Sequence, residues 1–227
     1  ALLKRNFEGF EADDLDPYVT TMTSYAGDLD DRVVFRPEKP KETLPELVSS
    51  WGGRQLRAAE TEKFAHVTFF FSCRREEPFP GEERLLIPSP RVATYDLKPE
   101  MSAPEVTEKT VWLVREQEFE LVMLNYANSD MVGHTGDWDA SLKALEAVDE
   151  SLSKVIPVLR ERGYTVFLTA DHGNVEQMVH PETKEPFTEH TLFPVPLLVT
   201  DTTLRLRPEP GKLADIAPTV MRAVGWE

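Results

Sequence analysis

The sequence contains 227 residues, with 25 Lys and Arg against 40 Asp and Glu, and therefore carries a formal charge of −15. Because 41% of the residues are hydrophobic and 29% are charged, the composition is that of a folded protein rather than a disordered acidic tail. The single cysteine excludes a disulfide framework within the chain, and the acidic balance argues against nucleic acid as the main partner. No apolar run approaches the ~18 residues that span a membrane, so we expect a cytoplasmic protein without a membrane partner.

The first half of the chain predicts a linker, a short helix, a strand and a charged loop. The linker is expected at residues 37–40, which contain two prolines. A helix is expected to start at Thr43 and to stop before the glycines at 52 and 53. Residues 67–71 form an almost entirely apolar run of residue types that favour strands, and residues 76–83 are expected to form a solvated loop.

The second half alternates expected strands and helices. The strands are expected at residues 121–124, 165–168 and 195–199, and the helices at residues 139–162 and 215–224. In the longer helix, apolar residues recur at steps of three and four, while Pro157 is expected to kink or shorten it and Gly163 to end it. This alternation predicts an α/β protein with a largely parallel sheet flanked by helices.

Histidines and aspartates follow the expected strands, at the positions where ligand sites of α/β sheets lie. The first strand is followed by Asp130 and His134, the second by Asp171 and His172, and the third is preceded by His190. We expect these segments to meet at the same edge of one sheet. Neutral imidazoles and carboxylates suit Zn²⁺ or Mn²⁺ without a thiol, so the pattern indicates a divalent metal site.

The spacing of these residues suggests two ions. Asp130 and His134 are four residues apart with Gly133 between them, which would let one tight turn aim both at one ion. Asp171 and His172 are neighbours, so their side chains are expected to diverge and could bind a second ion or bridge a pair. Two metals ~4 Å apart would clamp the attacking and leaving oxygens of a phosphoryl transfer.

Each of these motifs also has an ordinary structural explanation. An Asp-His-Gly sequence after a strand can be a simple turn, and His190 taken alone can be a surface residue. We interpret His66 as a strand-edge residue and His180 as a loop residue at the surface. For Lys63 two alternatives stay open, a contact with a substrate phosphate or a surface salt bridge.

Five longer segments resemble those of the cofactor-independent phosphoglycerate mutases. They are residues 56–71, 93–102, 125–134, 169–174 and 189–196, and the resemblance spans nearly the whole chain. It implies an alkaline-phosphatase-like fold and the interconversion of 3-phosphoglycerate and 2-phosphoglycerate through a phosphoserine. It also implies two divalent ions, with Mn²⁺ the expected metal and Zn²⁺ or Co²⁺ the alternatives.

The resemblance assigns roles to the motif residues and to parts of the chain. It implies that Asp130, His134 and His190 hold one ion, that Asp171 and His172 belong to the other, and that Lys63 is the active-site lysine. Residues 1–37 would be the tail of a phosphotransferase domain with a linker. Residues 38–227 would be a metal-binding phosphatase domain that lacks its N-terminal strands.

Three departures from the family qualify this implication. The family's nucleophilic serine, a further aspartate ligand and its substrate-clamping arginines have no counterpart here, so we expect the C-terminal part of a mutase whose partner is the missing N-terminal portion. Without that portion, edges of buried strands would be exposed. Cys73 and Arg74 stand where the family has two glycines, which places side chains near the site unless the loop sits elsewhere.

Two other functions remain open at this point. One is a metal-dependent phosphatase of the alkaline phosphatase superfamily, and the other is a catalytically inactive metal-binding fragment. Members of the mutase family are usually monomers, and their substrate is a small phosphorylated acid.

Overall fold

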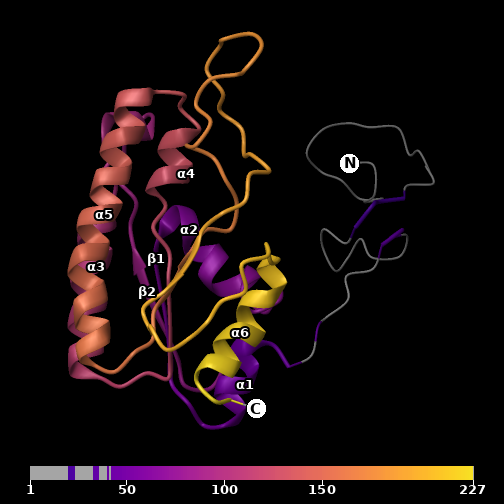
Figure 1. Cartoon of the computed structure of the whole chain (residues 1–227), viewed down its shortest axis with the longest axis vertical. Coiled ribbons are helices and arrows are strands. Elements are labelled where there is room, and N and C mark those ends of the chain that lie inside the picture. The colour runs from indigo at the N-terminus through magenta and orange to yellow at the C-terminus, as the bar shows by residue number, and fades with distance from the viewer. Residues whose placement is uncertain (1–19, 24–32, 36–39, 41, 227) are drawn as a thin grey trace, which may run out of the picture. The chain divides into compact units, whose positions relative to one another are not determined.

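The computed structural model describes residues 20–23, 33–35, 40 and 42–226 and divides the chain into two compact units, Ala1–Lys41 and Glu42–Glu227 (Figure 1). In the first unit, the described residues contain one parallel bridge, between Thr21 and Val33. Most of the expected transferase tail at residues 1–37 lies outside the described residues, as does the expected linker at 37–40 apart from Pro40. Everything that follows concerns the second unit.

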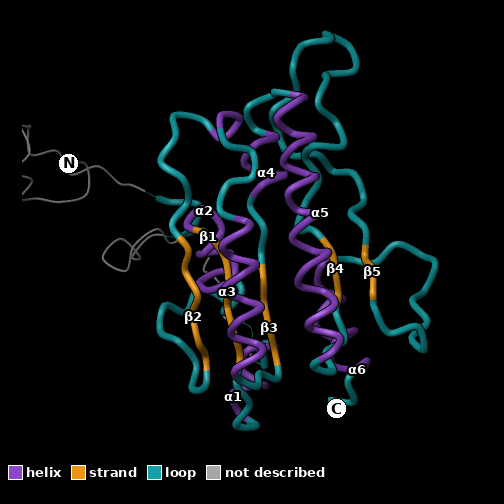
Figure 2. The backbone as a smooth tube through the Cα atoms, turned by 90° about the vertical axis from the view of Figure 1, so that its left-hand side faces the viewer, coloured by secondary structure: helices purple, strands orange, loops and turns teal. Residues whose placement is uncertain are grey.

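Two small sheets carry this unit (Figure 2). Three parallel strands in the order β2-β1-β3 form the first: β1 (Gln55–Glu60), β2 (Glu82–Ile87) and β3 (Leu121–Leu124). The second is an antiparallel pair, β4 (Phe167–Thr169) and β5 (Leu197–Val199). The predicted α/β class with a parallel sheet flanked by helices is therefore confirmed, but β4 and β5 pair with each other rather than extending that sheet.

Six α-helices surround these strands in the described part of the chain. They are α1 (Leu44–Ser50), α2 (Thr61–Ala65), α3 (Ala103–Glu116), α4 (Asn128–Gly133), α5 (Trp138–Glu161) and α6 (Ile216–Ala223). Helices α3 and α5 lie side by side and cover one face of the parallel sheet (Figures 1 and 2). Leu56 and Ala58 alternate along β1 toward this face and join Val114 of α3 and Val155 of α5 in the main hydrophobic core.

The capping and periodicity signals placed most of the expected helices correctly. Helix α1 begins directly after Thr43, and α5 begins where the Asp137 carboxylate accepts a hydrogen bond of 2.7 Å from the Ala140 N–H. Pro157 lies inside α5 without shortening it, and Gly163 follows its end with a φ of 84°. The expected strands at 121–124, 165–168 and 195–199 correspond to β3, β4 and β5.

The predicted strand at residues 67–71 is wrong. Residues His66–Phe70 form a short π-helix that continues α2, and the strand of this region is β1, which ends at Glu60 before α2 begins. A helical path buries Val67 and Thr68 on the same side as Lys63, and this packing outweighs the weak strand preference of the apolar run. His66 is consequently a helical residue and not a strand-edge residue.

Candidate metal centre

Asp130 is the centre of a cluster of side chains at the carboxyl end of β3. It lies in α4, and its carboxylate is 14% exposed. Its Oδ1 atom is 2.9 Å from His190 Nε2, 3.0 Å from His134 Nε2 and 3.9 Å from His172 Nε2. Three histidines from separate parts of the sequence thus approach one carboxylate oxygen.

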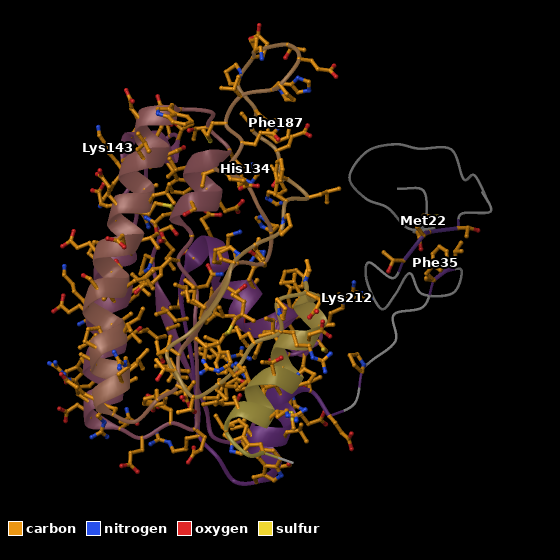
Figure 3. All side chains as sticks on the ribbon, in the orientation of Figure 1. Met22, Phe35, His134, Lys143, Phe187 and Lys212 are labelled. Carbon is orange, nitrogen blue, oxygen red and sulfur yellow. The ribbon has the colours of Figure 1, made fainter. Side chains whose placement is uncertain are left out.

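The orientation of His134 leaves its Nε2 atom with a lone pair. Its Nδ1 lies 2.7 Å from the Thr188 carbonyl, and only an N–H can make that contact. Figure 3 shows His134 near the loop that carries Phe187. In the neutral ring, Nε2 is then an acceptor that faces Asp130 Oδ1 and lies 3.1 Å from His190 Nε2.

This donor set fits a divalent cation. A carboxylate oxygen and two imidazole nitrogens lie mutually about 3 Å apart, close enough for the three atoms to bind one divalent ion. Asp130, His172 and His190 likewise offer ligand atoms within 4.8 Å of one another. The His172 ring stacks on the His190 ring with centroids 3.6 Å apart, so His172 borders the same set.

Asp171 and His172 do not diverge as the sequence analysis expected. His172 Nε2 is 3.6 Å from Asp171 Oδ1, and the chain bends at these two residues. The Asp171 side chain is 51% exposed, which leaves it free to bind a ligand from the solvent side. His180 is half-buried and lies in a separate loop, where its Nδ1 accepts hydrogen bonds from the N–H groups of Glu182 and Thr183.

Lys63 is buried and pairs with the same aspartate. Its Nζ lies 2.5 Å from Asp130 Oδ2, and its side chain is 6% exposed, which excludes the interpretation as a surface salt bridge. Burial alone would raise the pKa of Asp130, but hydrogen bonds from Lys63 and Asn174 and the nearby charges lower it to about 2. Asp130 is therefore ionised at neutral pH, as a metal ligand has to be.

A cavity of about 1230 Å³ leads from this cluster between the two sheets. Its walls are mainly apolar and come from β3, α5, β4 and α6, with Val122, Leu124, Leu145, Leu152 and Val220 among them. Its lining also includes Lys63, Asp130, Asp171 and His172. One side of the cavity is β3, which pairs with β1 on its other side.

The expected meeting of the motif residues is therefore observed, but by a different route. Asp130 follows the parallel sheet and His172 follows the antiparallel pair, so the residues do not share the edge of one sheet. Gly133 lies within α4 rather than in a tight turn. Asn174, Glu176 and Thr191 hydrogen-bond around the cluster, and nothing in their spacing along the sequence predicts this.

Among the described residues, none of the helices combines the length and the apolar character that crossing a bilayer requires.

Cys73, the only cysteine in the sequence, is a free thiol. Cys73 and Arg74 both have positive φ, at 52° and 67°, and Arg74 is exposed.

Comparisons with known proteins identify relatives of this chain. A curated 2,3-bisphosphoglycerate-independent phosphoglycerate mutase from Clostridium botulinum (strain Langeland) is 50% identical over 98% of this chain and 44% of its own length. The mutase of the same name from Acetivibrio thermocellus is 50% identical over 100% of this chain and 45% of its own length. The chain thus spans less than half the length of these relatives.

A solved structure agrees with the sequence comparison. A crystal structure of Leishmania mexicana phosphoglycerate mutase at low cobalt concentration superposes with a TM-score of 0.81 and 31% identity, over 91% of this chain and 41% of that chain. A family model described as the metalloenzyme superfamily matches residues 17–227. The chain belongs to this metalloenzyme superfamily.

Proposed function

We propose that this chain is the metal-holding part of a cofactor-independent phosphoglycerate mutase. The reaction interconverts 3-phosphoglycerate and 2-phosphoglycerate through a phosphoserine, and the serine belongs to polypeptide outside this chain. The observation that carries the proposal is the convergence of Asp130, His134 and His190 to about 3 Å. The proposal is supported by 50% sequence identity to two mutases over 98% and 100% of this chain.

The metal ligands are assigned within this proposal. Asp130, His134 and His190 hold one divalent ion, and Asp171 with His172 contributes to a second. Mn²⁺ is the proposed metal, since carboxylates with imidazoles suit it, and Zn²⁺ or Co²⁺ fit the same donors. When bound, such ions would supply positive charge that stabilises the oxygens of a phosphoryl group.

Lys63 has a separate role in the proposed mechanism. Its buried ammonium keeps Asp130 ionised in the absence of other cations. Because Lys63 Nζ lies beside the proposed ligand Asp130, its ammonium would also be placed to bind a substrate phosphate held at the metal centre. Lys63 thus serves as the active-site lysine that binds and orients the substrate.

The cavity between the two sheets is the proposed binding place for the remaining polypeptide. The apolar walls from α5 and α6 and the outer side of β3 would accept a strand, because a strand pairs with a free edge and buries apolar side chains. A strand laid parallel to β3 ends at Asp130, where a serine and a further aspartate are needed. We therefore propose that the remaining mutase polypeptide fills this cavity.

The compartment proposed for the assembled enzyme is the cytoplasm.

A reconstitution assay tests the function. Conversion of 3-phosphoglycerate to 2-phosphoglycerate is measured with Mn²⁺, using this chain alone and this chain with the remaining polypeptide of a related mutase. We expect turnover only in the combined sample. Asp130→Ala and His134→Ala should abolish it, while His180→Ala should leave it unchanged, because His180 lies outside the cluster. Turnover that survives both ligand substitutions would refute the assignment.

The same assay separates the alternatives. Release of inorganic phosphate from phosphoglycerate without isomerisation would favour a phosphatase of the alkaline phosphatase superfamily. If the remaining polypeptide and the metal both bind but no turnover follows, the result would favour an inactive metal-binding fragment.

A pair of α5 variants tests the cavity as the docking surface. Leu145 lines the cavity and is 41% exposed, so Leu145→Asp should weaken binding of the complement with little loss of the chain's own stability. Lys143, two residues earlier, is exposed and does not line it (Figure 3), and Lys143→Asp should leave binding unchanged. Equal affinities for both variants would contradict the proposed docking site.

A further inference from the structure

A set of hydrogen bonds behind the metal cluster connects the segments that carry its ligands. We call the three residues that make them, Asn174, Glu176 and Thr191, the clamp. Asn174 is 5% exposed, and its Nδ2 donates to Asp130 Oδ1 over 3.0 Å and to the Asp130 carbonyl over 3.3 Å. This side chain therefore fixes the direction in which the Asp130 carboxylate points.

Glu176 is the member that reaches both other residues. One carboxylate oxygen accepts the Asn174 N–H over 2.7 Å, and the other accepts a short hydrogen bond from the Thr191 hydroxyl. Thr191 directly follows His190, and its own N–H donates to the Gly173 carbonyl over 3.0 Å. The segment carrying His190 is thereby tied to the segment carrying His172.

Two glycines make room for the clamp. A Cβ on Gly133 would lie 2.3 Å from Asn174 Oδ1, and a Cβ on Gly173 would lie 2.2 Å from both Glu176 Oε1 and Thr191 Oγ1. Neither glycine has a positive φ, so close approach rather than backbone conformation requires them. The glycines of both motifs are thus explained by contacts with the clamp.

We propose that the clamp positions the metal centre: Asn174, Glu176 and Thr191 set the separation of the Asp130 carboxylate and the His190 imidazole before an ion arrives. This inference rests on the proposed metal site. The physical reason is that an outer hydrogen bond holds a ligand in its binding orientation, so the ion does not have to order it. Removing such partners typically weakens metal binding by about 10- to 100-fold.

Cobalt titration of the chain tests the clamp, because the visible absorption of Co²⁺ reports the geometry of its ligands as well as its affinity. Glu176→Ala removes both acceptors, and we expect affinity to fall by about 10- to 100-fold with a changed absorption band. Glu176→Gln should retain most of the affinity, since the amide oxygen still accepts the Asn174 N–H and its NH₂ can donate to the Thr191 oxygen. This rescue distinguishes positioning from loss of the side chain.

A pair of isosteric variants keeps the test independent of folding. Thr191→Val breaks the contact with Glu176 without changing side-chain volume, and it should lower Co²⁺ affinity and alter the band. Thr107→Val is the matched control, because Thr107 is also buried but its hydroxyl bonds to the Ala103 carbonyl in α3 and to Tyr126. Circular dichroism verifies that each variant is folded. If Glu176→Ala does not fold, the Co²⁺ affinity and spectrum of Thr191→Val decide whether the clamp positions the ligands.

The outcomes separate this inference from the proposed function. The clamp is supported if the wild-type chain binds Co²⁺ and if Thr191→Val and Glu176→Ala bind it more weakly with a changed spectrum. Glu176→Gln and Thr107→Val should then resemble the wild type. Wild-type binding with equal affinities and spectra in every variant would overturn the clamp and leave the metal site standing. A wild-type chain that binds no Co²⁺ would overturn both.

Discussion

Replacing Cys73 and Arg74 with glycine should stabilise the chain. Both residues have φ in the left-handed region, and their N–H groups donate to the carbonyls of Phe70 and Phe69 at the end of the π-helix. This is the C-terminal position of a helix where glycine is favoured, because a Cβ there crowds the backbone. Glycine, which the resemblance to the mutases implied for these two positions, would relieve this crowding.

The magnitude follows from two opposing terms. A left-handed conformation costs a residue with a Cβ ~1–2 kcal/mol. Glycine loses ~0.5–1 kcal/mol more backbone entropy on folding. The net gain is about 0.5–1 kcal/mol at each position, or about 1–2 kcal/mol for the double variant. At about 2–4 °C per kcal/mol for a domain of this size, the double variant should melt about 2–8 °C higher.

Thermal unfolding followed by circular dichroism measures this gain. Cys73→Ala and Arg74→Ala are the matched controls, because alanine removes the functional group but keeps the Cβ that causes the strain. We expect the glycine variants to melt above both the wild type and the alanine variants. Alanine variants that gain as much as the glycine variants would refute the backbone argument and point to the lost thiol or charge instead.

Three further substitutions test other parts of the structure. Lys63→Met should destabilise the metal-free chain by about 3 kcal/mol at neutral pH, since it leaves Asp130 buried without its cation. The pKa of Asp130 lies at about 2 in the fold against 3.8 ordinarily, so this stabilisation is present above about pH 4 and fades as the pH falls toward 2. Urea unfolding at several pH values should show that the difference in stability between wild type and variant closes in this range. A difference that stays constant with pH would contradict the argument. Pro157→Ala should stabilise α5 by up to about 3 kcal/mol by restoring a backbone N–H, and an unchanged urea midpoint would show that the helix already accommodates the proline. Gly173→Ala should weaken Co²⁺ binding as Glu176→Ala does, because its Cβ would overlap the Glu176 carboxylate, and wild-type affinity would argue against that close contact.

In the parallel sheet, the sequence pattern predicted the apolar strand β3 and missed β1, whose buried residues are partly polar. Helix α5 was evident because its core residues recur at helical spacing. Strand β1 was missed although all six of its residues are buried, because Gln55, Arg57 and Glu60 are polar. Gln55 donates to the Pro45 carbonyl, and the Arg57 guanidinium lies 4.6 Å from the Phe71 ring centre. Such partners are tertiary contacts that a local pattern does not contain.

The meeting of Asp130, His134 and His190 was predictable from the sequence, but the framework that brings them together was not. The rule that ligands follow strand ends identified Asp130 and His134, since short connections keep such residues near the strand they follow, while His190 was identified by its place before the next strand. It did not reveal that α4 carries Asp130 or that two separate sheets contribute. The clamp residues are of types common on any surface, and Glu176 is exposed, so only the folded chain brings them to the site.

The two sheets are joined at both ends of the cavity, and this couples the cavity to the metal centre. At the far end the Phe119 N–H donates to the Tyr164 hydroxyl over 3.1 Å, and at the site end Asn174 donates to Asp130. Between these two hydrogen bonds, apolar side chains of α5 line the cavity. A strand that filled the space would fix the distance between β3 and β4, and hence between Asp130 and His172, which follow them. Completion of the core and alignment of the metal ligands would then be one event, and the clamp is the part of that alignment that this chain already makes by itself.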